Sequence, residues 1–489
     1  MTDDDPDDRA ALTTRQMRIT AIIVASALFM QNLDSTIVAT ALPAMAKSFH
    51  ADPIHMSLAL TSYLLSLAVF IPASGWFADR FGSRTVFRLA ILIFTIGSVF
   101  CGLSHTLAEL IGARILQGAG GSMMVPVGRL LLLKSVRRRD MLAATSWLTM
   151  PALIGPIIGP PLGGFIVTYI SWRWTFDINV PIGVIGIVAV TVYIREVRDA
   201  EHAGRLDLVG LILSGLAMAL VMAGIETIGR GIIPWPDVAA CFAIGLGSGF
   251  AYWRHALHTE HPVLDLSLMR IDTFANSTIA GSFFRVLAGA MPFLLPLMLQ
   301  LGFGDSAAKS GTVTFAAAIG ALAMKPLAQP ILRRFGFRIS MVVFGLLSVI
   351  FTAACAAFRP SWPVLALDAV LLIGGVFRSL QFTAFNTIAY ADVPRSRMSA
   401  ATSFYATFQQ ITITLGISIA AGSLELSTAL SGHADPTIAD YSWAFIIISL
   451  IGLISVPVCA RLAAEAGDDV SGHHAEPAPP IDARSAPRQ

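Results

Sequence analysis

Two charged residues stand in the middle of long apolar runs of the sequence. Asp34 lies within the run 19–41, and Arg114 lies within the run 107–133. A charged carboxylate is costly in lipid and usually serves a function there. An apolar environment favours the uncharged form of a carboxyl group, so Asp34 could bind a proton that competes with a substrate. The alternative is a packing role, in which Asp34 bonds to the hydroxyl groups of Ser35 or Thr36.

Arg114 keeps its positive charge at physiological pH and therefore needs an acidic partner or a wet cavity. If it approaches Asp34, it favours the charged form of that carboxyl group. It could instead bind an anionic group directly, or it could hold helix carbonyl groups in a purely structural role. Asp34 and Arg114 are the candidate proton-coupling residues.

Three further basic residues, Arg285, Lys325 and Arg378, lie in later apolar runs. If they face one cavity together with Arg114 and Asp34, that cavity is net basic, unlike a site built for lipophilic cations. We therefore expect neutral or anionic amphipathic substrates. The aromatic residues available for apolar contact with such a substrate include Tyr63, Phe284, Phe382 and Tyr405.

The composition as a whole indicates a membrane protein. Of the 489 residues, 55% are hydrophobic and 13% are charged, and the mean hydropathy is +0.71. A soluble domain has about 25% charged residues, so a soluble enzyme is nearly excluded. The net charge of +2 offers no overall attraction to nucleic acid. The four cysteines lie far apart without a metal-binding or disulfide spacing, so no metal site is expected.

Apolar runs long enough to cross a bilayer recur along nearly the whole chain. An even number of spans places both termini on one side of the membrane. The fourteen expected spans are approximately 19–41, 56–78, 85–103, 107–133, 141–169, 177–194, 207–228, 236–256, 273–301, 308–332, 340–358, 362–390, 399–425 and 441–462.

The basic residues give an independent check on this count, because Lys and Arg collect in cytoplasmic loops. Of the 33 Lys and Arg residues, 23 fall on the side that carries both termini, 5 fall on the other side and 5 fall inside the apolar runs. A miscount of one span would scramble this alternation. We therefore expect a multi-pass membrane protein with both termini in the cytoplasm.

The two halves of the chain share short matches that occur in the same order. The segments 80–84, 114–117 and 143–147 are echoed by 334–338, 378–381 and 400–404. Six spans of the first half thus correspond to six of the second, with two spans left between them. Paired helical bundles of this kind enclose a pathway near the bilayer midplane and rock to give alternating access. No phosphate-binding loop is present, so ATP is not expected to drive such a transporter.

The predicted fold class is an all-α polytopic membrane protein with fourteen transmembrane helices. The expected units are an acidic cytoplasmic tail (1–18), a six-helix bundle (19–200), two inserted helices (201–262), a second six-helix bundle (263–465) and a disordered cytoplasmic tail (466–489).

Five segments together resemble the motifs of one family. The segments 33–43, 75–84, 114–118, 155–164 and 172–183 read LDSTIVATALP, GWFADRFGSR, RILQG, GPIIGPPLGG and WRWTFDINVPIG. The set resembles the drug:proton antiporter-2 family, the fourteen-helix branch of the major facilitator superfamily, along nearly the whole membrane region. Ala39 stands where that family usually has Asn. Such an ordered set is far more specific for the family than for a substrate.

The resemblance implies a major facilitator fold with proton coupling or substrate sensing at Asp34. It also implies a latch between the halves on the cytoplasmic side, where Asp79 could pair with Arg80, Arg84 or Arg88. The expected gating residues are Gly75, Asp79, Arg80, Gly82 and Arg84. The expected antiporter motif, which the family places at the interface between the halves, comprises Gly155, Pro156, Gly159, Pro160, Gly163 and Gly164. Generic packing of small residues is the alternative for this last set.

These features predict a proton-driven antiporter that exports small amphipathic compounds across a bacterial cytoplasmic membrane. The proton gradient would be the energy source, with no cofactor, and the expected partners are the substrate, protons and lipid. We expect the protein to work as a monomer. An exporter of an endogenous metabolite, amino acid or lipid would carry the same motifs. A membrane enzyme or sensor is the other class, but no metalloprotease motif and no loop long enough for a catalytic domain are present.

Overall fold

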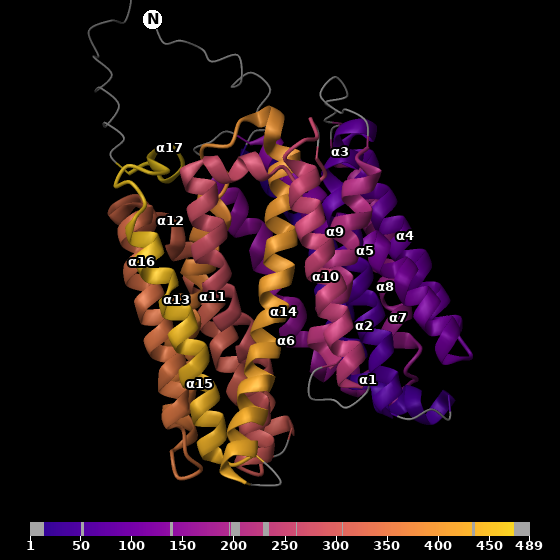
Figure 1. The fold of residues 1–489 in the computed structure, drawn as a ribbon, viewed down its shortest axis with the longest axis vertical. Coiled ribbons are helices and arrows are strands. Elements are labelled where there is room, and N and C mark those ends of the chain that lie inside the picture. The colour runs from indigo at the N-terminus through magenta and orange to yellow at the C-terminus, as the bar shows by residue number, and fades with distance from the viewer. Residues whose placement is uncertain are drawn as a thin grey trace, which may run out of the picture.

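A computed structural model describes the fold of most of the chain. The described residues are 14–49, 53–136, 140–194, 196, 206–227, 234–260, 262–305, 307–432 and 436–473. Within these ranges every regular element is helical, and the helices run roughly parallel in two groups (Figure 1). The predicted tails, 1–18 and 466–489, lie largely outside the described residues.

The N-terminal half is built around pairs of long helices that pack side by side. α1 packs on α6, and α5 packs on both α2 and α4. Its elements are α1 (Thr14–Phe49), α2 (Pro53–Phe70), η2 (Ile71–Ala73), α3 (Ser74–Phe81), α4 (Ser83–Leu103), α5 (Leu107–Ser135), α6 (Met141–Tyr169), α7 (Trp174–Asp177) and α8 (Asn179–Tyr193).

Two helices follow that belong to neither half by sequence, α9 (Leu208–Thr227) and α10 (Trp235–Ala256). They pack on each other, and α9 also contacts α2 and α14. Asp207 lies just before α9, and its Oδ1 is 2.7 Å from Nε2 of His255 near the end of α10. This contact joins the two helices at one end. The 3-10 helix η4 (Leu266–Arg270) then leads into the C-terminal half.

The C-terminal half repeats the arrangement of paired helices. The long element α12 is broken at Gly336, whose φ of 69° lies outside the helical region, so it comprises two helices, one for each of two predicted spans. The elements are α11 (Asp272–Leu297), η5 (Met298–Gly302), α12 (Ala307–Ala354), η6 (Cys355–Ala357), α13 (Val364–Ile388), η7 (Arg395–Arg397), α14 (Met398–Ser431), α15 (Ile438–Leu453), α16 (Ser455–Ala460) and α17 (Asp468–Ser471).

The helices have the length and surface expected of a membrane protein. In the described part of the chain, 9 helical stretches are long and apolar enough to cross a bilayer. Each of the expected spans overlaps at least one helix, while the total of fourteen stays a prediction. Large apolar side chains such as Phe165, Val188, Phe250 and Ile339 are exposed on the helix surfaces, which is stable only where lipid replaces water.

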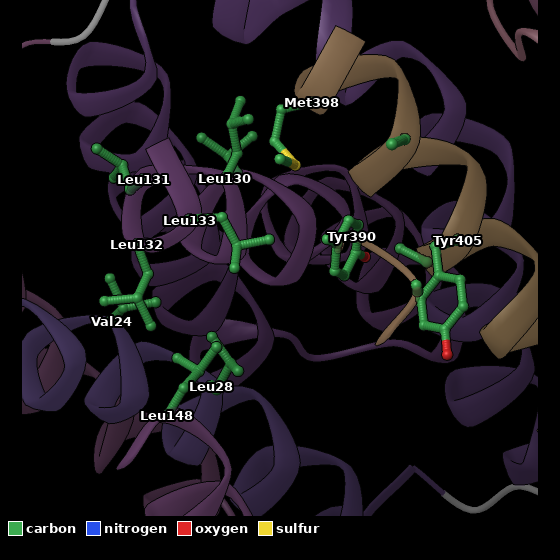
Figure 2. Close-up of a cluster of buried hydrophobic side chains, with 14 of the residues drawn as sticks. Val24, Leu28, Leu130, Leu131, Leu132, Leu133, Leu148, Tyr390, Met398 and Tyr405 are labelled. Atoms are coloured by element: carbon green, nitrogen blue, oxygen red, sulfur yellow. The ribbon is translucent and has the colours of Figure 1, made fainter. Parts of the chain in front are cut away.

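The two halves meet at the end of the molecule that carries α3 and α17, at the top of Figure 1. Leucines 130–133 of α5 pack there in one buried cluster with Tyr390, Met398 and Tyr405 of the other half (Figure 2). Among the described residues, the side-chain hydrogen bonds between the halves also lie at this end: Ser74 with Ser403, Asp79 with Ser399, Arg129 with Tyr390, and Arg395 with the Val136 carbonyl.

Candidate functional site

Asp34 and Arg114, the two charged residues singled out from the sequence, form a buried ion pair. Arg114 Nη1 lies 2.6 Å from Asp34 Oδ2, and both side chains are fully buried. α5 and α1 therefore bring together opposite charges that are far apart in the chain. Such a pair is strongly coupled, because removing one charge leaves the other without compensation in an apolar interior.

Neutral amide groups complete the environment of the carboxylate. Gln117 Nε2 and Asn179 Nδ2 both donate to Asp34 Oδ1, each at 2.9 Å. Both amides also donate to the hydroxyl oxygen of Ser98, at 2.7 and 3.2 Å. Asp34 thus accepts from three donors that come from α5 and α8, so both of its carboxylate oxygens have hydrogen-bond partners.

The guanidinium of Arg114 is also positioned by groups on α2 and on its own helix, α5. Its Nε donates to the carbonyl of Ala59 at 3.0 Å, and its Nη1 also donates to Gln117 Oε1 at 2.6 Å. Residues three apart share one face of a helix, which is why Arg114 and Gln117 reach the same partner. The ring of Tyr63 packs 4.2 Å from Arg114 Cζ, in a cation–π geometry.

The hydroxyl groups next to Asp34 in the sequence do not bond to its carboxylate. Ser35 Oγ donates to the carbonyl of Asn32 at 2.9 Å, and Thr36 Oγ1 donates to the carbonyls of Asn32 and Leu33. Both hydroxyls therefore satisfy backbone groups of their own helix. The contacts of the Asp34 carboxylate are made with residues of other helices.

Asp79 occupies a junction between the halves. Its Oδ1 lies 3.1 Å from Nζ of Lys134, a residue of α5, and its Oδ2 accepts a hydrogen bond from Ser399 Oγ of α14. The sequence suggested Arg80, Arg84 or Arg88 as its partner, and the structure differs. Arg84, the second residue of α4, instead donates to the carbonyl of Thr191 on α8.

The rest of the gating loop is fixed by tight contacts. A Cβ on Gly75 would lie 2.7 Å from both the carbonyl oxygen of Ser399 and Ser403 Oγ, so only glycine permits this approach of α3 to α14. Gly82 has a φ of 90°, which favours glycine, and it ends α3. Arg80 is exposed at the end of α3.

The glycines of the segment 155–164 pack against α1. A Cβ on Gly155 would lie 3.1 Å from the backbone nitrogen of Leu33, and a Cβ on Gly159 would overlap Thr36. These two glycines therefore contact the turns that flank Asp34, within their own half, although α6 as a whole also contacts α12 and α13. Gly163 is buried, and the side-chain surroundings of Pro156, Pro160 and Gly164 lie outside the described residues.

The residues expected to line one substrate cavity separate into three groups. Tyr63 joins the Asp34 and Arg114 pair, as described above. Arg285 lies over the ring of Tyr405, with 4.5 Å between its Cζ and the ring centroid. The third group is the pair of packed rings of Phe284 and Phe382, while Lys325 donates to Thr383 Oγ1 at 2.9 Å. Arg378 is half-buried on α13 and belongs to none of these groups.

The comparison with known sequences settles the family. The sequence profile of the Major Facilitator Superfamily matches residues 24–417 and 278–486. The chain belongs to this superfamily. It is therefore a multi-pass membrane transporter of small molecules and not an enzyme.

Relatives in this superfamily cover almost the whole chain. A candidate multidrug resistance protein of Escherichia coli O6:H1, MdtD, is 38% identical over 89% of this chain and 92% of its own length. MdtD of Salmonella typhimurium is 39% identical over 81% of this chain and 84% of its own. Multidrug resistance is thus the role named for these relatives.

Solved structures of the superfamily share the fold at low sequence identity. The human organic anion transporter MFSD10 aligns with a TM-score of 0.66 at 14% identity, over 91% of this chain and 99% of its own. The proton:xylose symporter XylE aligns with a TM-score of 0.62 at 12% identity, over 91% of this chain and 95% of its own. These likenesses support the major facilitator architecture.

Several polar residues of this facilitator escaped the sequence analysis. Gln117 and Asn179 stand inside the motifs that carried the family resemblance, so their membership of a motif was the available signal. Ser98, Lys134 and Ser399 gave no such signal. Serine is common in membrane helices, where it usually bonds to its own backbone, and only the packing of α4 and α14 shows otherwise.

Proposed function

We propose that this facilitator is a proton-coupled exporter of small amphipathic compounds that works by alternating access. The observation that carries the proposal is the fully buried ion pair between Asp34 and Arg114. The names of the 38–39% identical relatives support multidrug export as the physiological role. Protons would enter as substrate leaves, and the cytoplasm would lie on the side of the Arg-rich loops.

The coupling step follows from the number of donors on Asp34. Protonation would cancel the charge that faces Arg114, and the protonated oxygen would no longer accept from its amide or guanidinium partner. Arg114, Gln117 and Asn179 would then be held less tightly to α1. Because these residues belong to α5 and α8, a proton on Asp34 would loosen the packing of three helices, and substrate arriving at the same helices would favour proton release.

The gating step would use the contacts of Asp79. With Lys134 and Ser399 bonded to the one carboxylate, the cytoplasmic ends of the halves stay joined. Opening toward the cytoplasm would break the bond to Ser399 and keep the bond to Lys134, which belongs to the same half. The residues of this loop would thus determine from which side of the membrane the pathway is accessible.

Everted membrane vesicles test the coupling. Acidifying the vesicle interior should drive uptake of a fluorescent amphipathic probe, with ethidium as the cation and dansylglycine as the anion. Replacing Asp34 with Asn should abolish pH-gradient-driven uptake, because the neutral amide cannot exchange a proton. Asp237→Asn is the matched control, since Asp237 is exposed on α10. Undiminished gradient-driven uptake by Asp34→Asn would refute proton coupling at this residue.

A further inference from the structure

Arg285 is a buried cation that has no acidic partner in the described part of the chain. Only 1% of its surface is exposed, and none of the described residues accepts a hydrogen bond from its Nη1 or Nη2. The ring of Tyr405 faces the guanidinium, but a cation–π contact uses the flat face of the group. The N–H donors project in the plane of the guanidinium, so stacking leaves them without acceptors.

The local sequence makes room for this guanidinium. Gly281 lies one turn before Arg285 on α11, and a Cβ there would come within 2.9 Å of Arg285 Nη1. A side chain at position 281 would therefore occupy the space beside the donor edge. The combination of a small residue with an unpaired, buried donor edge is typical of a binding site rather than of helix packing.

A second buried arginine reaches the same tyrosines from the other half. Arg129 of α5 is 7% exposed, and its Nη1 donates to Tyr390 Oη at 3.2 Å. Its Cζ lies 6.0 Å from the centroid of the Tyr390 ring and 5.9 Å from that of Tyr405. The two rings pack edge to face, 5.5 Å apart. Figure 2 shows both tyrosines beside the leucines that flank Arg129 in the chain.

The cluster of Arg129, Arg285, Tyr390 and Tyr405 carries two positive charges. Among the described residues, neither arginine has an Asp or Glu within ion-pair distance. This differs from the Asp34 site, where the charge of Arg114 is neutralised. Two uncompensated charges in an apolar interior are strongly destabilising, and an anion supplied by a ligand would remove that penalty.

We propose that this cluster is the binding site for the anionic group of the transported substrate, held between Arg129 of one half and Arg285 of the other. A planar carboxylate, or a sulfonate, on an apolar aromatic body fits this chemistry. The fork of a guanidinium binds such groups through paired hydrogen bonds, and the tyrosine rings contact the apolar body. The proposal rests on the export function above and specifies its substrate class.

The position of the cluster explains how an anion would couple to the rocking motion. Arg129 and Arg285 belong to different halves, while Tyr405 contacts both of them. An anion that bridges the two arginines is held by both only while the halves are joined near Tyr390 and Tyr405. An anion that enters from the cytoplasm while the halves are apart gains its second arginine when they join. Its binding therefore favours closure of this end, which is the direction that export requires.

Binding to the purified protein in detergent tests the site without any proton gradient. Three probes share one fluorophore: dansylglycine carries a carboxylate, dansylamide is neutral and dansylcadaverine carries an ammonium group. Fluorescence titration should give the tightest Kd for dansylglycine. Arg285→Gln and Arg129→Gln should each raise the Kd for dansylglycine at least about tenfold, as expected for a lost charge-assisted contact. Each should change the Kd for dansylamide less than about twofold.

Further variants distinguish a specific loss of binding from misfolding. Arg285→Lys keeps the charge and loses the fork, so an intermediate loss for dansylglycine is expected. Arg334→Gln is the matched control, because Arg334 also stacks on a ring, that of Phe335 at 5.5 Å, but is exposed. Equal weakening of dansylglycine and dansylamide, or tightest binding of dansylcadaverine, would overturn the proposal.

A lipid phosphate has the same charge as a substrate carboxylate, so a separate experiment must distinguish the two. Phosphatidylglycerol added to the micelles should leave the Kd for dansylglycine unchanged, because the cluster is at most 7% exposed at either arginine. Competition by this lipid that disappears in Arg285→Gln would assign the cluster to a lipid headgroup and overturn the substrate site. Because no gradient is applied, this assay stands or falls independently of the Asp34→Asn vesicle assay.

Discussion

Ser399 of α14 donates a hydrogen bond to Asp79 of α3, so a carboxylate of one half is held by a hydroxyl of the other. The same carboxylate pairs with Lys134 of its own half. A neighbouring contact, between the hydroxyl oxygens of Ser74 and Ser403 at 2.9 Å, joins the same two helices. The closure of this end therefore depends on small polar residues at close range, and not on a large apolar contact alone.

A disulfide at the Ser74 and Ser403 contact should lock this end. The double variant Ser74→Cys, Ser403→Cys places two thiols where the hydroxyl oxygens are 2.9 Å apart, close enough for a bond under mild oxidation. Probe uptake in everted vesicles should stop on oxidation and return on reduction. Each single variant is the control, since it cannot form this bond. Normal uptake by fully cross-linked protein would contradict a role for separation at this contact.

Replacing Gly75 with Ala should push the halves apart at the end of the molecule that carries α3. The new Cβ would meet the backbone oxygen of Ser399 at 2.7 Å, and a backbone group cannot rotate away. Overpacking of this kind costs about 1–3 kcal/mol, which would disfavour the joined state by about 5- to 150-fold. Spin labels on Phe81→Cys and Ser396→Cys, both exposed positions, should report a longer distance.

Gly247→Ala is the control for this variant, because a Cβ on Gly247 meets nothing within 4 Å. The same pair of spin labels should give the wild-type distance in Gly247→Ala. An unchanged distance distribution in Gly75→Ala would mean that the helices accommodate the methyl group, and that the approach of α3 to α14 does not depend on glycine.

Gln117→Leu should destabilise the protein and impair coupling together. The amide donates to Asp34 and Ser98 and accepts from Arg114, so leucine leaves two charged groups with one partner fewer each. The expected cost is about 2 kcal/mol or more. Thermal unfolding in detergent measures the stability, and gradient-driven uptake measures the coupling. Gln300→Leu is the control, because its contact with Ser310 is 3.5 Å long and neutral; an equal loss in both variants would argue against a special role for Gln117.

The fold was accessible from the sequence for a physical reason. Lipid offers no hydrogen bonds, so each span must be a helix of apolar residues, and the pattern of those runs is visible without any tertiary information. The apolar composition and the spacing of basic loops therefore predicted a helical membrane protein, and the superfamily match confirms it. The sharp break at Gly336, where two helices meet without an intervening loop, depends on local backbone geometry and could not be read from hydropathy.

The candidate site was only partly accessible. Asp34 and Arg114 were conspicuous because a charge within an apolar run has few explanations. Asn179 and Ser98 carry no charge. Asn179 donates to Asp34, and Ser98 accepts from Gln117 and Asn179, only because of how α4 and α8 pack. The pairing of Asp79 with Lys134 in place of Arg84 is a similar case, since loop charges close in sequence can point to different helices.

Gly82→Ala should be destabilising for two separable reasons. Gly82 has a φ of 90°, which an L side chain adopts only with strain. The carboxylate of Glu196 also occupies the space of a Cβ, while it accepts from the Arg84 backbone nitrogen at 3.0 Å and from Thr85 Oγ1 at 2.7 Å. We expect a loss of about 1–3 kcal/mol, measured by thermal unfolding in detergent.

A double-variant cycle with Glu196→Ala separates the two causes. If crowding by Glu196 matters, Gly82→Ala should cost less in the Glu196→Ala background than in the wild type, and the difference is the coupling free energy. Gly304→Ala gives the backbone cost alone, because Gly304 has a similar φ of 73° and a Cβ there meets nothing within 4 Å. A cost for Gly82→Ala equal to that for Gly304→Ala in both backgrounds would exclude crowding, and Glu196 would then act only by capping the first turn of α4.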